Sequence, residues 1–464
     1  MKKLYTVMLS LLVAVAALIG LWSLVDKDAT ESESENRRLA AKPKFSLSAL
    51  LDGSYAAELE TYYSDTFPGR EALLKANSVL NKFYIFSGKE DNNMLVIDFT
   101  NDVGEGGQAL DPLPPPVEEQ PDPQEQEPVI PEEEQTPVEP EAEEEEEPDY
   151  DSMEVTNAGS IIILGDRAMD IPTATDAIIV SYAEAVNNIH DAIGHDVRVL
   201  PLIAPNSGQF YSPTDMHTGV HDQKAMIELC YENLQPDVLA VDAFSALEKN
   251  RKQALYFRTD HHWTQLGAYY AYTAFCEAAG FAPVPLEEHE SGTYDRFIGS
   301  MYTYTKQYPQ SSVLKENPDT LTYYMPIAKT TAAFYADANI GSTTTYWTQV
   351  VNPDLPEDEY NKYMCFMSGD HPAAQITSDV EGPVCLVLKD SYGNAFLPFL
   401  TNHYSKIYVI DPREFNHDGK PSLDLISFVQ EYEVDDVILV NYSFMINNAK
   451  YVKWLNRLVG LAYD

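Results

Sequence analysis

Positive charge and cysteine are the two things that this 464-residue sequence has little of. It carries 30 lysines and arginines against 73 aspartates and glutamates, which gives a formal net charge of −43. Phosphate affinity comes from Lys and Arg displacing counterions, so this balance excludes a nucleic-acid-binding protein. The four cysteines, Cys230, Cys276, Cys365 and Cys385, include no C-x-x-C pair. Their spacing excludes a zinc ribbon or a disulfide scaffold and leaves one or two disulfides open.

Signature motifs of several enzyme classes are missing as well. The chain has no Walker loop, no G-x-G-x-x-G, no G-x-S-x-G and no H-E-x-x-H. The motifs of nucleotide sites, the common serine-hydrolase elbow and the zincin site are therefore absent. What is present is core-forming material, because 44% of the residues are hydrophobic and 11% are aromatic. A chain of this length and composition folds as one large globular domain or as two to three smaller ones.

The N-terminus carries a long apolar run. Lys2 and Lys3 precede an almost unbroken apolar stretch from Leu4 to Val25, which is long enough for a helix to cross a bilayer. Because the run continues well past its small alanines, we predict an uncleaved transmembrane signal-anchor, with a cleaved signal peptide as the alternative. The positive-inside rule keeps the two lysines in the cytoplasm. We therefore expect a single-pass protein of the cell membrane with an extracellular body.

Residues 103–151 differ in kind from the rest of the chain. They contain nineteen Asp or Glu, eleven Pro and no Lys or Arg. Such a segment cannot bury enough apolar surface to offset its chain entropy, so we predict a disordered insertion. Short apolar runs at 94–99 and 160–164 flank it, and we interpret it as an insertion at the tip of a β-hairpin formed by these runs. A functional acidic tail that binds cations or a basic surface is the alternative.

Regular elements are predicted on both sides of this insertion. Before it, apolar residues recur at helical spacing from Ser46 to Phe86, with a turn at DTFPGR (65–70). After residue 160, short apolar strands alternate with amphipathic helices; strands are expected at 197–203, 238–241, 384–388, 406–410 and 437–440, and helices at 177–193, 223–233 and 266–279. This alternation predicts an α/β fold with a mostly parallel sheet covered on both faces. The Tyr- and Thr-rich residues 290–380 are interpreted as long loops with some antiparallel strand.

The segment RTDHHWT, at 258–264, is the first candidate for chemistry. Asp260 and His262 are two residues apart, so in an extended segment both side chains project to one side. Asp260 can then approach Nδ1 of His262, fix its tautomer and leave Nε2 free as a base, while His261 points the opposite way. Two histidines and an aspartate also suggest a metal site. No further ligand lies at a useful spacing, so we predict no metal and no cofactor.

The segment PVCLVLKDSYGNAF, at 383–396, is the second candidate. An apolar strand ends at Lys389-Asp390, Ser391 follows in a turn, and Gly393-Asn394 precedes a predicted helix. A serine after a strand is most often a helix N-cap. At the carboxyl end of a parallel strand, next to a helix N-terminus, it is also where a nucleophile gains from exposed backbone N–H groups. The two segments together supply a nucleophile, a base and an orienting carboxylate.

These motifs resemble the DHHW family of bacterial extracellular proteins. They also resemble its relatives, the alginate O-acetyltransferases AlgX and AlgJ, which belong to the SGNH hydrolase superfamily. The shared motifs are ENR (35–37), DTFPGR (65–70), APN (204–206), TDHHWT (259–264), FIGS (297–300), KDSYGN (389–394) and IDPR (410–413). The resemblance implies a triad of Asp260, His262 and Ser391, in a chain order permuted relative to ordinary SGNH esterases. The acidic insertion departs from the usual pattern and leaves the motifs untouched.

The resemblance also implies an architecture, a three-layer SGNH-hydrolase-like α/β domain preceded by the transmembrane helix. We expect a signal-anchor (1–25), a juxtamembrane tether (26–45), a helical part (46–102), the acidic insertion (103–151) and the catalytic domain (152–464). Asn206 and Arg413, each of which follows a strand, are expected to bind an oxyanion or the substrate. His261 is expected to be structural or to support the triad, and Trp263 to pack the loop.

The function implied is acyl transfer, most simply O-acetylation of a cell-envelope exopolysaccharide through an acyl-serine. The implied partners are the polysaccharide acceptor and a membrane-bound O-acyltransferase that delivers the acetyl group. A carbohydrate esterase of the same fold is the close alternative, because water can replace the sugar. A non-catalytic envelope-assembly or binding protein is the alternative from another class, against which an intact Asp260, His262 and Ser391 set argues.

Overall fold

The computed structural model describes residues 148–340, 346–356, 359–417 and 419–461, together with short stretches between residues 31 and 67. The predicted anchor at 4–25, the acidic segment up to residue 147 and most of the helical part at 46–102 lie outside these residues, so those predictions remain predictions. In the part that is described, no helix combines the length and the apolar character needed to cross a bilayer. A short antiparallel pair, β1 (Glu31–Ser32) with β2 (Arg37–Arg38), falls within the predicted tether.

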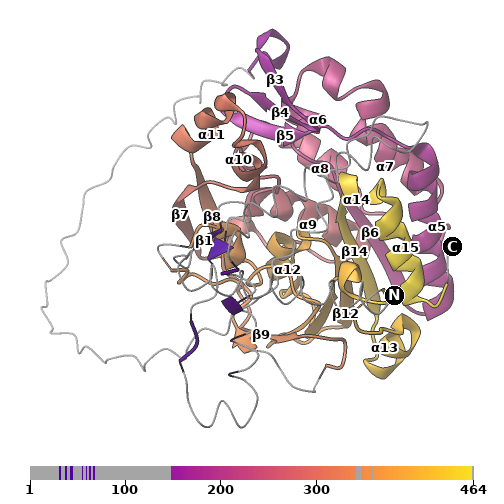
Figure 1. Ribbon diagram of the computed structural model, residues 1–464. Helices are drawn as coiled ribbons and strands as arrows, with labels where there is room; N and C mark the ends of the chain where they lie inside the picture. Colours follow the sequence, from indigo (N-terminus) through magenta and orange to yellow (C-terminus); the bar gives the residue numbers. More distant parts are fainter. Residues whose placement is uncertain are drawn as a thin grey trace, which may run out of the picture.

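A seven-stranded sheet forms the centre of the described body (Figure 1). In spatial order its strands are β10 (Tyr346–Thr348), β9 (Thr330–Tyr335), β11 (Ala373–Ser378), β13 (Lys406–Ile410), β12 (Val384–Lys389), β14 (Asp436–Tyr442) and β6 (Arg198–Ala204). The four strands from β13 to β6 run parallel, and every residue of β14 is buried. The other three pairings are antiparallel. The predicted strands after residue 380 are confirmed, but the sheet is parallel only in this half.

The predicted long loops supply the antiparallel half of the sheet. The Tyr- and Thr-rich stretch 290–380 contains β9, β10 and β11, together with a separate hairpin of β7 (Ser291–Phe297) and β8 (Asp319–Tyr324). The expected strand at 238–241 is reduced to one bridge, in which Val241 pairs with Leu202 at the edge of β6. Whether a run of β-branched and aromatic residues forms a strand depends on whether another strand lies beside it to share hydrogen bonds. The local sequence pattern does not reveal that partner.

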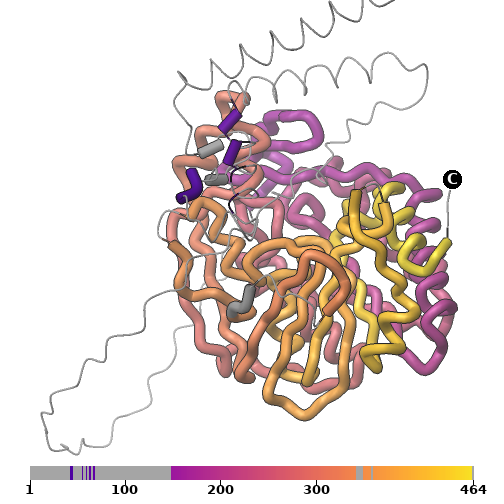
Figure 2. The backbone as a smooth tube through the Cα atoms, turned by 60° about the horizontal axis from the view of Figure 1, so that its bottom comes forward, coloured from indigo at the N-terminus to yellow at the C-terminus, as the bar shows by residue number. Residues whose placement is uncertain are grey.

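Helices cover both faces of the sheet. They are α5 (Asp176–Ile193), α6 (Gly208–Tyr211), α7 (Gln223–Glu232), α8 (Ala243–Lys249), α9 (Gln265–Ala279), α10 (Ser300–Thr305), α11 (Ser312–Glu316), α12 (Gly393–Leu400), α13 (Leu425–Glu431), α14 (Ser443–Ile446) and α15 (Ala449–Leu458). α5 packs against α7, α13 and α15, and α9 packs against α8 and α12. Figure 2 shows the yellow C-terminal segment beside the magenta segment of α5, as in Figure 1.

Polar contacts from β14 show that these helix groups lie on opposite faces. Asp436 and Asn441 are five residues apart on the strand, so their side chains point to opposite sides. Asp436 accepts two 2.6 Å hydrogen bonds from Arg198, which also donates to the carbonyl of Ala279 at the end of α9. On the other face, Tyr182 of α5 donates to Asn441 at 2.8 Å. The α/β class and the helices predicted at 177–193, 223–233 and 266–279 are therefore confirmed.

A small antiparallel sheet precedes this sandwich in the sequence. It consists of β3 (Val155–Ala158), β4 (Ile161–Leu164) and β5 (Arg167–Asp170), with β4 in the middle. We expected the run at 160–164 to pair with residues 94–99, but both edges of β4 are occupied by its immediate neighbours in sequence. That pairing is therefore wrong for β4, and residues 94–99 lie outside the described residues. The four cysteines are all buried and free, so they form no disulfide.

Candidate active site

Ser391 lies where the structure gathers the carboxyl ends of the parallel strands. It lies in the short turn between β12, which ends at Lys389, and α12, which begins at Gly393, and it is partly exposed. Asp390, beside it, is buried and accepts hydrogen bonds from the N–H groups of Tyr392 and Tyr442 and from the Asn441 amide. Because Asn441 and Tyr442 end the adjacent strand β14, these bonds tie the Ser391 turn to two strands at once. The position of the serine is thus fixed by the sheet.

The Asp260–His262 segment is a turn between α8 and α9, and not the extended segment that we considered from the sequence. The Phe257 N–H donates to the His262 carbonyl at 3.3 Å, and the His262 N–H donates back to Asp260 Oδ1 at 3.0 Å. The Thr264 side chain then caps α9 by accepting from the Gly267 N–H at 3.2 Å. Asx turns of this kind hold an aspartate against the backbone two residues on. The predicted contact between Asp260 and His262 is confirmed, for a different geometric reason.

Asp260, His262 and Ser391 form one hydrogen-bonded chain. Nδ1 of His262 lies 2.6 Å from Asp260 Oδ1, and Nε2 lies 2.7 Å from Ser391 Oγ. With Nδ1–H donating to the carboxylate, the free lone pair of Nε2 accepts the serine hydroxyl. Both Asp260 and His262 are buried, whereas the hydroxyl reaches partly exposed space. The arrangement can deprotonate Ser391 as it attacks a carbonyl carbon, which is the geometry of nucleophilic catalysis by a serine.

The second carboxylate oxygen of Asp260 is held from a separate loop. The Ser300 N–H donates to Oδ2 at 2.8 Å, and Gly299 approaches so closely that an added Cβ there would lie 2.3 Å from Oδ2. Burial on its own raises the pKa of the Asp260 carboxyl, but the neighbouring His262 charge, its hydrogen bond and the Ser300 N–H bring the pKa well below its ordinary value. Asp260 therefore stays ionised and stabilises a positive charge on His262.

Tyr363 is a site residue that the sequence did not reveal. Its ring stacks on the His262 imidazole, with centroids 3.9 Å apart and planes within 8°. Its hydroxyl donates to the Ser391 carbonyl at 3.1 Å. One side chain therefore restrains both the His262 ring and the Ser391 turn. It lies in the irregular Tyr-rich stretch, where one tyrosine among many carries no distinguishing signal.

His261 and Trp263 surround the triad without joining it. The His261 ring lies against His262, with centroids 3.8 Å apart, so the expectation that it points the opposite way is wrong. Its Nδ1 bonds the Ser300 hydroxyl at 2.6 Å. Burial and the charge of His262 lower the pKa of His261 to about 3, so the ring is neutral. Trp263 is buried and donates to the Tyr392 carbonyl at 3.0 Å, which fits the expected packing role.

The amide of Asn206, in the loop after β6, forms three hydrogen bonds within the chain. Its Nδ2 donates to the Asp170 carbonyl at 3.2 Å. Its Oδ1 accepts from the Gly208 N–H at 2.9 Å and from Gln223 at 2.8 Å. The structure therefore gives Asn206 a loop-bracing position, and its expected role at an oxyanion or a substrate remains a prediction.

Arg413 belongs to a buried charged network beside the Ser391 turn. Its guanidinium bonds Asp411 and, at 2.6 Å, Asp370. Asp370 also accepts from Lys389 at 2.6 Å and from Asn394 at 2.9 Å, and these two residues bracket the Ser391 turn. Contact of Arg413 with a substrate remains a prediction, since the contacts seen here go to carboxylates of the chain itself. Asp370 lies between strands in the sequence, where no motif marks it.

Asp170 is a further buried carboxyl close to the site. It ends β5, its side chain is 4% exposed, and its Oδ1 has no hydrogen-bond partner among the described residues. Burial and the negative charge of nearby Asp260 raise its pKa to about 7. No sequence feature distinguished it from the many other acidic residues.

The described residues contain one cluster of side chains that could hold a metal ion. Ligand atoms of Asp260, His261 and His262 lie within 4.8 Å of one another. Both oxygens of Asp260 and Nδ1 of His262 already form the hydrogen bonds given above. The chemistry of the set fits a proton relay to Ser391 better than a metal centre, and the expectation that no metal is used remains a prediction.

Comparison with known proteins agrees with this architecture. A sequence model described as DHHW protein matches residues 35–95 and 128–410. A DHHW family protein from Eubacterium siraeum is 27% identical with a TM-score of 0.57, and the match covers 65% of this chain and 97% of that chain. Bacillus cereus PatB1 with a sulfonyl adduct is 18% identical with a TM-score of 0.51, covering 64% of this chain and 98% of that chain.

Other comparisons add less. The O-acetyltransferase domain of Pseudomonas putida AlgJ is 13% identical, covers 66% of this chain and 99% of that chain, and has a TM-score of 0.36, too low for a detailed comparison. No curated protein matches the chain. The family model nevertheless spans most of the sequence, including the TDHHWT and KDSYGN segments that meet at the triad. The chain therefore belongs to the DHHW protein family.

Proposed function

We propose that this protein is an extracellular, membrane-anchored O-acyltransferase of SGNH type that acetylates a cell-envelope polysaccharide through an acyl-Ser391 intermediate. The observation that carries the proposal is the chain of two short hydrogen bonds from Asp260 through His262 to Ser391 Oγ. A binding protein has no use for a buried carboxylate that orients an imidazole toward a partly exposed serine. The anchor and the envelope location rest on the apolar run at Leu4–Val25.

The first half of the reaction forms the acyl-enzyme. Ser391 Oγ attacks the carbonyl carbon of the acetyl donor while its proton passes to Nε2 of His262. Asp260 stabilises the resulting imidazolium. The Ser391 N–H makes no hydrogen bond with the described residues and can therefore donate to the oxyanion of the tetrahedral intermediate. One such donor typically contributes about 3 kcal/mol to the transition state. The leaving group departs with the proton from His262, and an acetyl ester remains on Ser391.

The second half transfers the acetyl group to the glycan. Nε2 of His262, neutral again, accepts the proton of a sugar hydroxyl as its oxygen attacks the ester carbonyl. Collapse of the second tetrahedral intermediate returns the proton to Ser391 Oγ and releases the acetylated sugar. An extracellular enzyme needs a source of acetyl groups that reaches across the membrane. We propose a membrane-bound O-acyltransferase as the partner that supplies it.

The test treats the full chain with two reagents. A sulfonyl fluoride labels a reactive serine, and a chromogenic acetyl ester reports ester cleavage. PatB1, which shares the fold, was captured with a sulfonyl adduct, so the same reagent class suits this chain. We expect label on Ser391, and we expect Ser391→Ala and His262→Ala to abolish labelling and ester cleavage. Ser443→Ala is the matched control, because Ser443 follows β14 as Ser391 follows β12 and bonds Gln223 at 2.5 Å.

Three outcomes decide between the functions. Acetyl groups that appear on added glycan oligomers, and only with intact Ser391, would support transfer. Release to water alone, in the presence of glycan, would assign an esterase. Label on a residue other than Ser391, or ester cleavage that survives in Ser391→Ala, would overturn the proposal.

A further inference from the structure

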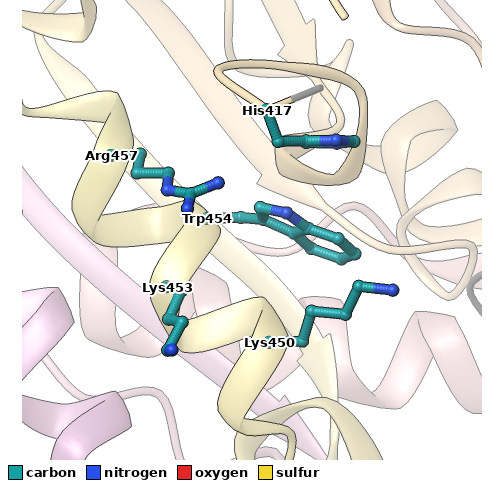
Figure 3. Close-up of a pocket in the computed structure, with 5 residues that line it drawn as sticks. All are labelled: His417, Lys450, Lys453, Trp454 and Arg457. Atoms are coloured by element: carbon teal, nitrogen blue, oxygen red, sulfur yellow. The ribbon is translucent and has the colours of Figure 1, made fainter. Parts of the chain in front are cut away.

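A cavity on the outer side of α15 gathers basic side chains. It measures about 280 Å³, near the small end of typical ligand pockets, and is lined by His417, Lys450, Lys453, Trp454 and Arg457. Figure 3 shows the His417 ring over the Trp454 indole, with Lys450 and Arg457 on either side of the indole. Among the residues that the structure describes, no acidic side chain lines this cavity, which we call the α15 basic pocket. It is therefore a local concentration of positive charge in a chain whose net charge is −43.

The helix itself accounts for only one of these charges, because Arg457 lies in the last turn of α15, where the helix dipole favours a cation. Lys450, Lys453 and Arg457 are spaced by three and four residues, so they lie on one face of α15 and repel one another. Lys450 is in the first turn, where the helix dipole disfavours a cation. Among the described residues, neither Lys453 nor Arg457 forms an ion pair with a carboxylate. An anion seated in the pocket would relieve this repulsion.

The floor of the pocket is rigid. Trp454 is 4% exposed, and the His417 ring stacks on it with centroids 5.1 Å apart and planes at 27°. The Lys450 ammonium lies 5.2 Å from the indole centroid. Nε2 of His417 donates to the Arg413 carbonyl at 2.6 Å, and Arg457 donates to the Asn416 carbonyl at 3.4 Å. Since these contacts exist without a ligand, little ordering is needed when one binds.

The lining chemistry selects the class of ligand. Ammonium and guanidinium groups are donors only, so they favour a ligand group that only accepts hydrogen bonds, such as a phosphate or a carboxylate. The apolar residues of α15, including Tyr451, Leu455 and Leu458, are buried against the body. The helix therefore offers no apolar face to insert into a membrane, and a soluble polyanion fits better than a lipid surface.

The pocket and the nucleophile share one framework. His417 is fixed by the carbonyl of Arg413, whose guanidinium binds Asp370. Asp370 in turn accepts from Asn394, three residues after Ser391. A polymer held at the pocket would therefore be held by the same rigid part of the fold that carries the Ser391 turn.

We propose that the α15 basic pocket binds a phosphate or carboxylate group of an anionic glycan. The inference rests on the proposed function in taking this glycan to be the acceptor, but binding itself requires no turnover. It names the substrate class as a polysaccharide with negative charge. The pocket then holds one charged unit of the polymer at a place separate from the triad.

The test measures binding by calorimetry with the full chain carrying Ser391→Ala, so that nothing is consumed. The probes are a uronic-acid oligosaccharide, poly(glycerol phosphate) and a neutral glucose oligosaccharide of similar length. We expect one of the charged probes to bind, more weakly as salt rises, and the neutral probe not to bind. Lys450→Gln with Lys453→Gln should weaken binding roughly tenfold, because two charge-assisted contacts are lost. Lys224→Gln with Lys249→Gln, on α7 and α8, is the matched control and should bind normally.

Two results would overturn the inference. One is equal affinity for the charged probes in the pocket variant and in the control variant. The other is binding to vesicles of phosphatidylglycerol and not to either charged glycan, which would make the helix a membrane contact. The pocket substitutions, made with Ser391 intact, should leave cleavage of a small acetyl ester unchanged. The effect of Ser391→Ala on ester cleavage tests the proposed function, whereas glycan binding tests the pocket. Either proposal can therefore be refuted without the other.

Discussion

Asp170→Asn tests whether a buried carboxyl beside the triad carries a proton at neutral pH. The side chain is almost fully buried, its Oδ1 is unpaired among the described residues, and burial together with the charge of Asp260 raises its pKa to about 7. A protonated carboxyl needs no counter-charge, whereas an ionised one would be a buried charge without a partner, which is costly. Asparagine has nearly the same shape and is neutral at every pH, so the substitution removes only the titration.

The sign and size of the effect follow from linkage. The folded pKa of about 7 lies above the reference value of 3.8, so the stability that this proton contributes is full below the unfolded pKa and is lost as the pH rises through the folded pKa. A difference of about three units corresponds to roughly 4 kcal/mol in all. Between about pH 5 and pH 8 the loss is roughly 2.5 kcal/mol for the wild type and absent for the variant.

Urea unfolding of both proteins across this pH range is the assay. The quantity to follow is the difference in unfolding free energy between Asp170→Asn and wild type. The contributions of the other titrating groups are common to both proteins and cancel in this difference. We expect this difference to shift in favour of the variant as the pH rises. Asp215→Asn, an exposed carboxylate, is the control and should show no such trend. A difference for Asp170→Asn that stays constant with pH would refute the reasoning.

Three further predictions concern the site and the core. Tyr363→Phe keeps the ring on His262 but loses the 3.1 Å bond to the Ser391 carbonyl, so ester cleavage should fall roughly fivefold, as for one hydrogen bond. Tyr363→Leu should lower the rate of ester cleavage further, because it also removes the ring that stacks on His262. Equal rates for the two variants would contradict a role for that stacking. Gly299→Ala should displace the Asp260 carboxylate and lower kcat far more than it raises KM; an unchanged kcat would show that the loop yields instead. Because the four cysteines are free, a thiol reagent should titrate four groups in the unreduced, unfolded chain, and added reductant should leave Tm unchanged; a lower thiol count would reveal a disulfide.

The sequence predicted the parts of this molecule whose causes are local. Strands such as Lys406–Ile410 and helices such as α5 are continuous apolar or amphipathic runs, so their periodicity identifies them. The triad was also predictable, because Asp260 and His262 are neighbours in sequence and Ser391 follows a recognisable strand. The contact between these two segments, 129 residues apart, came from the family resemblance and not from spacing.

What the sequence could not supply depends on distant packing. Tyr363 becomes part of the site only because its loop folds over His262, and Asp370 only because Lys389 and Arg413 converge on it. The same holds for the antiparallel half of the sheet, where β9 and β11 pair across a long connection. Asp170 looks like any other acidic residue until its burial is known. In each case the deciding quantity is the environment, which a local pattern does not contain.

The place of β14 in the sheet has a consequence for how the protein comes into being. β14 is the last of the described strands along the chain, yet it lies between β12 and β6. Apart from the single bridge to Val241, β6 has no other strand neighbour among the described residues. During synthesis, β6 therefore stays without its β14 partner until more than 200 further residues have been made. Such non-local pairing is slow and leaves unpaired strand edges that are prone to aggregation. The seven-stranded sheet is complete only when β14 joins it, so folding of the described body depends on a strand made long after β6.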